Sequence, residues 1–434
     1  MNAEASVAAS RFGLGPRPGE LAEIGSHPRE WLLDQLPPAS EDPRWLALGT
    51  SAARLAQARP IAQSGSEEAK EAAKALLRAT FLNDVGVRAE ILGASPRPFL
   101  ERWRMAWSNH FTVSVTRQVV AGLAVPFERE AIVPHATGKF LDLLRAATQH
   151  PAMLLYLDNL RSVGPNSLAG LRKERGLNEN LARELLELHT LGANGGYQQA
   201  DVEALAAMLT GWSLSKEEGS PGTVFRPELH QPGPKHFLGA AIAEGGPGEI
   251  DVALKRLAKH PSTARNVATR LARHFAADRP PERLVRGLER TFLESEGDLA
   301  EVAITLVNSD EAWADPLGKL RTPHDLVCAI SRGFGPADGA MQVKALRALG
   351  QIPFSAPSPA GWSDLAVDWA GSDQILARID LAERMGAKVQ IQAGQRAEDL
   401  LGPVLSASTR NAIASASAPR GLALLVASPE FQRR

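Results

Sequence analysis

Apolar residues recur at helical spacing along most of this chain, and this periodicity limits the accessible folds more than any other feature. In the segment 139–160, for example, Phe140, Leu143, Leu144 and Ala147 fall on one face of a helix. Clusters of Val, Ile, Tyr and Thr with the alternation typical of strands are scarce. The sequence therefore predicts an all-α fold, a large multi-helix protein with at most short strands.

Proline and glycine mark the breaks between these helices. His150 and His260 each precede a proline that stands where a new helix would begin, so we interpret both histidines as parts of a joint or cap. The stretch 213–248 is too rich in Gly and Pro for a long helix. It predicts one long loop between two helical blocks, and we expect it to lie over the helix beginning near Asn178.

The length of 434 residues suggests about two to three helical subdomains. A polar run at 63–70 and a Pro-rich break at 356–362 help to divide the chain. We expect an N-terminal helical region with a linker (1–95), a helical core that carries the main motifs and the loop (96–340), and a C-terminal helical region (341–434).

Composition excludes several classes of function. The 48 Lys and Arg nearly balance the 49 Asp and Glu, which does not favour a nucleic-acid partner. The single cysteine, Cys328, excludes an intrachain disulfide and a Cys-rich metal site. No apolar run approaches the roughly 18 residues of a membrane span, so a soluble protein is expected. The N-terminus shows no export signal, which predicts a cytoplasmic location, with a periplasmic one through a partner left open.

The segment 177–212 carries the densest group of polar residues beside an apolar stripe. On a wheel of about 100° per residue, Glu184 and Glu187 lie within roughly 40° of Asn180, while leucines form a separate stripe. His189 lies about 180° away and could join the carboxylates only if the helix ends or distorts there. Paired carboxylates suit acid/base chemistry, so Glu184 and Glu187 are predicted catalytic residues.

Several of these residues also have a purely structural interpretation. Glu184 and Glu187 could pair with Arg183 or with arginines of a neighbouring helix. Asn178 could cap the helix, and Asp201 could compensate the dipole of the next one. The predicted substrate-binding residues are Asn178, Asn180, Arg183, Asp201 and Trp212.

Histidines supply the remaining predicted site residues. His110 is assigned to the catalytic group, although a core role is equally consistent with its helical setting. His230 and His236 lie on the Gly/Pro-rich loop, where two imidazoles can approach one cation. The predicted ligands of a divalent metal are His189, His230 and His236. His274 and His324 are interpreted as hydrogen-bonded core residues.

The chain resembles the domain-of-unknown-function 1800 (DUF1800) family of bacterial proteins over nearly its whole length. The resemblance rests on four blocks and the C-terminus: LNENLARELLELHTLGANGGYQQADVEALAAMLTGW (177–212), WSNHF (107–111), HPAMLLYLDN (150–159), HPSTARNVATRLARHFAAD (260–278) and SPEFQRR (428–434). Gln231 and Val133 depart from the acidic residue and the arginine expected at these positions.

The resemblance implies an all-helical fold but no reaction. It also implies a partner, because members are often encoded beside a protein of the domain-of-unknown-function 1501 (DUF1501) family. The oligomeric state stays open. The chain lacks the His-Glu-x-x-His zinc pair, the phosphate-binding Gly-x-x-x-x-Gly-Lys-Ser/Thr loop and the Gly-x-Ser-x-Gly nucleophile elbow. Two hypotheses remain: an acid/base- or metal-dependent enzyme with its site on the 178–192 helix, or a non-enzymatic binding or assembly partner of a DUF1501-type protein.

Overall fold

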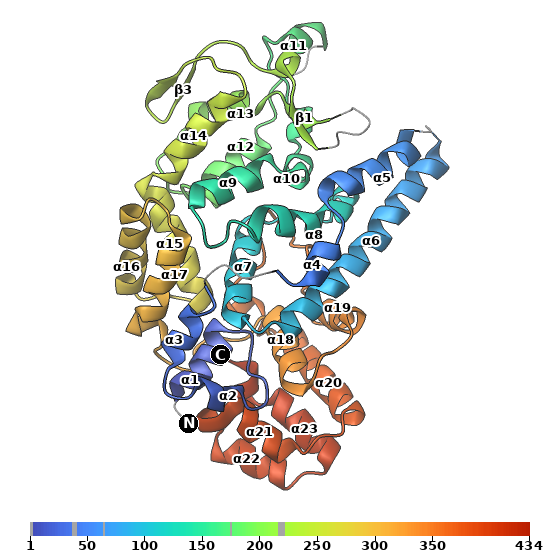
Figure 1. Ribbon diagram of the computed structural model, residues 1–434, viewed down its shortest axis with the longest axis vertical. Helices are drawn as coiled ribbons and strands as arrows, with labels where there is room; N and C mark the ends of the chain where they lie inside the picture. Colours follow the sequence, from blue (N-terminus) through green and yellow to red (C-terminus); the bar gives the residue numbers. More distant parts are fainter. Residues whose placement is uncertain (1–2, 37–40, 64–65, 174–175, 216–221) are drawn as a thin grey trace.

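A computed structural model describes residues 3–36, 41–63, 66–173, 176–215 and 222–434. The structure is 64% helical, and within these described ranges the strands form only two small two-stranded sheets, so the all-α prediction is confirmed. The molecule is elongated, with the chain's two small hairpins at one end and its C-terminal helices at the other (Figure 1). None of the described helices is long and apolar enough to cross a membrane.

The beginning of the chain packs against segments that are distant in the sequence. Phe12 is fully buried, and its ring packs against Phe99, Phe275 and Trp313, which come from three distant segments. The elements of this part are α1 (Ala3–Val7), the π-helical η1 (Ala8–Phe12), α2 (Glu20–Ile24), α3 (Pro28–Leu33), α4 (Pro43–Ala47), α5 (Ser51–Gln63), α6 (Glu67–Ala94) and α7 (Pro98–His110).

The central part begins after α7 and leads into the segment with the predicted carboxylate pair. His150 caps α10, because its Nδ1 accepts a hydrogen bond from the backbone of Ala152, and His260 caps a later helix through Ser262. The predicted role of both histidines is confirmed. The elements are η2 (Gln118–Leu123), α8 (Ala124–Phe127), η3 (Glu128–Ile132), α9 (Phe140–Gln149), α10 (Pro151–Tyr156), η4 (Asn159–Arg161), α11 (Leu168–Lys173), α12 (Asn180–Glu184), the π-helical η5 (Leu185–His189) and α13 (Gln199–Leu209).

The Gly/Pro-rich stretch is a loop between two helical blocks, as predicted, and carries two short antiparallel hairpins. In the first, Trp212 lies opposite Phe225, and in the second, Lys235 lies opposite Ile242. The elements are β1 (Trp212–Leu214), β2 (Thr223–Phe225), η6 (Pro227–Leu229), β3 (Lys235–Phe237) and β4 (Ala240–Ile242). Residues 216–221 lie outside the described part.

The second helical block and the C-terminal helices complete the fold. The block contains α14 (Gly248–Ala258), α15 (Pro261–Phe275), α16 (Glu282–Glu294), α17 (Leu299–Asn308) and η7 (Asp310–Ala312). The C-terminal helices are α18 (Pro323–Phe334), α19 (Gly339–Ala348), η8 (Ala366–Asp368), α20 (Ser372–Lys388), α21 (Ala393–Leu401), η9 (Gly402–Val404), α22 (Ala407–Ala414), α23 (Ala418–Ala427) and α24 (Pro429–Gln432).

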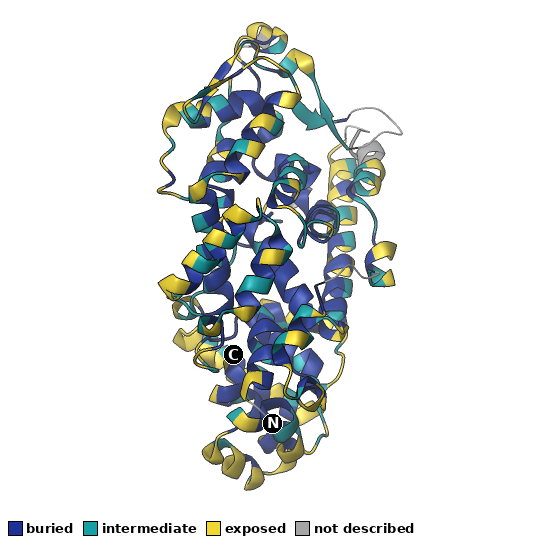
Figure 2. Ribbon diagram, turned by 60° about the vertical axis from the view of Figure 1, so that its left-hand side comes forward, coloured by how far each residue is buried: buried dark blue, intermediate teal, exposed yellow. Residues whose placement is uncertain are grey.

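Buried apolar side chains gather in two main clusters. The larger extends from Ala5 to Trp313, with Val343 added, and the smaller lies between Leu326 and Phe431. Buried residues run through the middle of the molecule, whereas many residues of the hairpins and the outermost C-terminal helices are exposed (Figure 2). Near α7, α15 and α18, polar side chains such as Arg102 and Asp325 are buried beside the apolar clusters.

Candidate functional site

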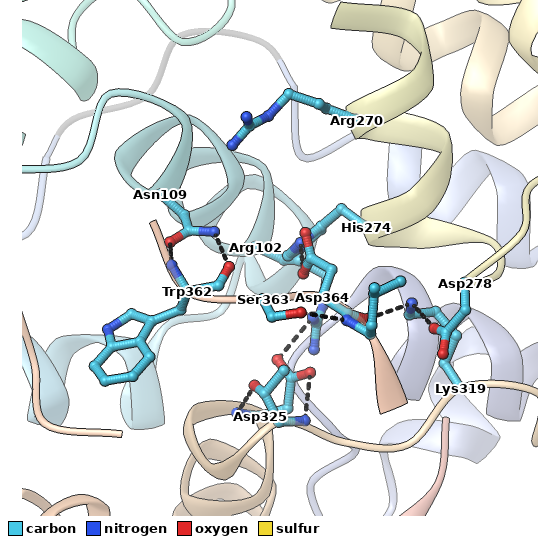
Figure 3. Close-up of polar contacts among 12 residues, drawn as sticks. Arg102, Asn109, Arg270, His274, Asp278, Lys319, Asp325, Trp362, Ser363 and Asp364 are labelled. Atoms are coloured by element: carbon cyan, nitrogen blue, oxygen red, sulfur yellow. Dashed lines mark hydrogen bonds and ion pairs between the residues drawn. The ribbon is translucent and has the colours of Figure 1, made fainter. Parts of the chain in front are cut away.

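A polar pocket opens where α7, α15 and α18 approach the irregular segment 351–364. It holds about 740 Å³ of space, including the part open to solvent. Asn109 of α7, His274 of α15, Asp325 of α18 and Asp364 of the irregular segment all line it. Figure 3 shows these side chains converging from elements that are far apart in the sequence. A smaller pocket shares Asn109, His274 and Asp364 with the first.

The irregular segment is fixed to α7 by a reciprocal pair of hydrogen bonds. The side-chain amide of Asn109 donates to the carbonyl of Trp362 at 2.8 Å and accepts from the Trp362 backbone N–H at 2.8 Å. Gly361, with φ of 84°, allows this approach, because a Cβ there would lie 2.5 Å from the Asn109 carbonyl. These contacts fix the backbone two residues before Asp364.

The buried His274 and the half-buried Asp364 form a dyad, and both residues line the two pockets. Nδ1 of His274 lies 2.8 Å from Oδ1 of Asp364, while Nε2 is buried and has no hydrogen-bond partner among the described residues. Burial lowers the pKa of His274, and Asp364 opposes this only in part. Burial also disfavours ionised Asp364, but His274 and Lys319 outweigh it and lower the Asp364 pKa to about 2. The arrangement therefore favours a neutral imidazole with an available lone pair.

Beneath the dyad lies a set of fully buried ion pairs. Asp325 lies 2.8 Å from Nη1 of Arg102 and 2.9 Å from Nε of Arg434. Although burial would raise the Asp325 pKa, the Arg102 and Arg434 charges hold it well below its usual range. Arg434 also donates to the backbone carbonyl of His274 at 3.0 Å. The floor of the site is thus a rigid network.

Arg270 and His110 border the smaller pocket. Arg270 lies one helical turn before His274, and Figure 3 shows its side chain extending from α15 toward the helix of Asn109. Nε2 of His110 lies 3.0 Å from the carbonyl of His189. Burial, and after it the charge of Arg270, lowers the pKa of His110 well below its ordinary value and that of His189 to about 3.

The structure brings Glu184 and Glu187 together on one partly exposed face. Neither forms an ion pair with any described residue, and Arg183 instead pairs with Glu179 at 2.7 Å. Burial, followed by repulsion from Glu187, raises the pKa of Glu184. The chain's two tyrosines lie near the pair: burial followed by the Glu187 charge raises the pKa of Tyr197, and burial followed by the Glu184 charge raises the pKa of Tyr156 to about 12.

The predicted substrate-binding residues mostly hold backbone in place. Asn178 accepts from the Asn180 N–H at 3.0 Å, as expected of a capping side chain, while Asn180 and Arg183 are exposed. Asp201 belongs to a capping box of α13, and its other oxygen accepts from Leu238 N–H at 2.6 Å. Trp212 is half-buried at the start of β1, where its ring lies 5.7 Å from that of Phe225.

The three predicted metal ligands lie in different surroundings. His189 contacts Phe111 and His110, whereas the imidazole of His230 lies 3.2 Å from Glu249 and 2.8 Å from the carbonyl of Thr210. His236 is exposed on β3. The expected approach of the loop histidines to the helix at Asn180 is not seen. No group of three or more His, Cys, Asp or Glu suited to a metal occurs in the described ranges.

The sequence analysis missed the dyad, because His274 reads as a core histidine and Asp364 lies 90 residues away. Spacing offers one signal: Arg270 and His274 are four residues apart, so two basic side chains share one face of an amphipathic helix. Asp364 follows the break at 356–362, which marks an irregular segment of the kind that often carries function. His110 was selected from the sequence and does border the smaller pocket.

The fold and the site define an all-α protein with a polar pocket between its two apolar clusters. The family model described as protein of unknown function (DUF1800) matches residues 7–433, so the chain belongs to the DUF1800 family, as the sequence motifs predicted. No curated protein and no solved structure matches the chain.

Proposed function

We propose that this protein is an enzyme that uses general acid/base chemistry, with His274 as the base and Asp364 as the residue that orients it. The observation that carries the proposal is the dyad itself: Oδ1 of Asp364 lies 2.8 Å from Nδ1 of His274, while the buried Nε2 of His274 has no hydrogen-bond partner among the described residues. His274 lines both pockets, so a substrate or water held there can hydrogen-bond Nε2 and give this buried nitrogen the partner that buried polar atoms generally have.

The dyad supports a simple proton cycle. Asp364 accepts the Nδ1–H, which places the lone pair on Nε2, and this atom takes a proton from water or a substrate hydroxyl as that oxygen attacks. The carboxylate then stabilises the imidazolium. The same proton leaves Nε2 for the departing group, which restores the neutral ring. Hydrolysis or group transfer fits this cycle.

Turnover of a panel of chromogenic esters, glycosides and phosphate esters tests the proposal. We expect the protein to cleave at least one member and His274→Gln to slow that reaction by about 100-fold, since general base catalysis contributes on the order of 10² to 10⁴. His27→Gln, which alters an exposed histidine, serves as the control. Equal rates in His274→Gln and the parent, or no turnover of any member, would contradict the proposal.

The carboxylate pair on α12 and η5 is a second candidate site, favoured by the absence of an ion pair to Glu184 or Glu187 among the described residues. Two adjacent carboxyl groups can divide acid and base roles, with His110 or His189 as further groups. The divalent metal remains a prediction. Equilibrium dialysis against Mn²⁺ tests it: retention of metal that Glu187→Gln abolishes would support a metal site here.

The assembly hypothesis rests on the resemblance alone. A DUF1501-family protein as partner is therefore proposed from family context and not from a surface of this molecule. Co-expression with a DUF1501 protein and co-purification at a fixed ratio would support it. Two proteins that elute separately after co-expression would count against it.

A further inference from the structure

We propose that Arg270 recognises an oxyanion, a carboxylate or a phosphate group, carried by the molecule that the His274 site acts on. This inference rests on the proposed function of that site and adds the chemical class of its substrate. The smaller pocket places Arg270 beside Asn109, His274 and Asp364. A group held by Arg270 would therefore lie next to the base.

The bonding of Arg270 leaves most of its donors free. Nη2 donates to the carbonyl of Ala360 at 3.2 Å, and no carboxylate in the described residues lies within ion-pair distance. A guanidinium has five N–H donors in a planar fork that matches two oxygens of a carboxylate or phosphate. Burial lowers the Arg270 pKa more than the nearby Asp364 raises it, so the surroundings do not fully compensate its charge.

Three arginines that are buried more deeply than the half-buried Arg270 differ from it in this respect, whereas the buried Arg11, Arg321 and Arg378 donate to neutral oxygens without an ion pair among the described residues. Arg88 is paired with Glu128 at 2.8 Å, Arg102 with Asp325 at 2.8 Å and Arg332 with Glu20 at 2.9 Å. Each of these guanidiniums already has its anion. Arg270 borders a pocket and has no carboxylate partner of this kind. An anionic ligand in that pocket would give its guanidinium the ion pair that the three paired arginines have.

The local field also favours an anion. Burial, and after it the Arg270 charge, lowers the pKa of both His110 and His189, so these imidazoles are neutral and do not compete as cations for the ligand. Asp364, the carboxylate of the dyad, already has the imidazole of His274 at hydrogen-bond distance from its Oδ1, so its charge is partly compensated. Hydrogen bonds from a guanidinium to a charged oxygen are stronger than neutral ones and fix the ligand's orientation.

Binding of two simple anions tests the inference without a known substrate. Inorganic phosphate and acetate are titrated separately at constant ionic strength, and the ¹H–¹⁵N signal of the Trp107 indole, which lines the pocket, reports binding. We expect a saturable shift with at least one anion. Arg270→Gln should weaken that binding at least tenfold, while Arg265→Gln, on the same helix and paired with Glu282, should leave it unchanged.

The outcomes separate this inference from the proposed function. Phosphate binding alone assigns a phosphorylated substrate, and acetate binding alone assigns a carboxylated one. His274→Gln should retain anion binding. If this variant loses catalysis and still binds the anion, both proposals are supported. If it keeps both catalysis and binding, only the acid/base role of His274 is contradicted. Equal affinity in Arg270→Gln and the parent, or no saturable shift with either anion, would overturn the inference.

Discussion

At the scale of single residues, the imidazole of His274 is subject to two opposing influences. Burial lowers its pKa, and the carboxylate of Asp364 raises it by a smaller amount. A group whose pKa is lowered stays deprotonated at a lower pH, so the base form persists below the ordinary value of 6.5. The catalytic rate should accordingly reach its plateau below pH 6.5.

Asp364→Asn separates orientation of His274 from its protonation. Loss of the carboxylate lowers the His274 pKa further, so the ring stays neutral at pH 7, but the amide can stabilise the wrong tautomer. We expect a fall of about 10²- to 10⁴-fold in kcat that raising the pH does not recover. The pH profile of kcat from pH 5 to 9 measures this. A variant that keeps the parent plateau rate, with its pH profile only shifted to lower pH, would show instead that Asp364 acts only on the pKa.

Glu184 is a residue whose charge disfavours the folded state. Its pKa is raised, so stability linked to this group is greatest below the unfolded pKa and declines as pH rises through the folded value. Glu184→Gln should therefore stabilise the protein at pH 7, by about 0.2–0.5 kcal/mol for the repulsion from Glu187. Urea unfolding at pH 7 measures the change. A loss of several kcal/mol would reveal a cationic partner that the described contacts lack.

At the scale of elements, Asp201 joins the first turn of α13 to the second hairpin. One carboxylate oxygen accepts from the Gln198 N–H at 2.9 Å, and the other accepts from Leu238. Asp201→Ala should cost about 1–2 kcal/mol of unfolding free energy. Hydrogen exchange should also speed up at the Leu238 amide. Glu203→Ala, on an exposed position of the same helix, is the control and should leave that amide unchanged.

The elements also show which parts of the site were accessible to sequence reasoning. The spacing of Glu184 and Glu187 placed them on one face, because a regular helix fixes that relation. The π-helical turn Leu185–His189 was not predicted, because apolar periodicity does not distinguish it from a regular helix; at its end, Thr190 Oγ1 donates to the Leu185 carbonyl at 2.6 Å. The hairpins in the loop were likewise beyond a pattern of Gly and Pro.

At the scale of the whole molecule, buried ion pairs join the two apolar clusters. Arg102 of α7 donates to the Gly13 carbonyl at 2.5 Å and pairs with Asp325 of α18, which also holds Arg434. Asp325→Asn leaves two buried guanidiniums without their anion and should cost about 3–5 kcal/mol. Asp310→Asn, at an exposed ion pair, should change stability by less than about 1 kcal/mol. Denaturant midpoints compare the two, and equal losses would contradict a central role for Asp325.

The helical class could be read from the sequence because helix periodicity is local. The dyad could not, because it depends on long-range packing: the Asn109–Trp362 hydrogen bonds span 253 residues and set the position of Asp364. No spacing rule on α15 indicates which distant segment will cover His274. Family resemblance gave the fold and the block order but no assignment of roles within the pocket.

The state of the His274 imidazole tests the central claim most directly. Long-range ¹H–¹⁵N correlation spectra, recorded from pH 5 to 8 and assigned with His274→Gln, identify the protonated nitrogen and the pKa. The account predicts a neutral ring at pH 7 with its proton on Nδ1, toward Asp364, and a pKa below 6.5. A ring protonated at both nitrogens at pH 7, or a neutral ring with its proton on Nε2, would contradict the assignment of His274 as the base.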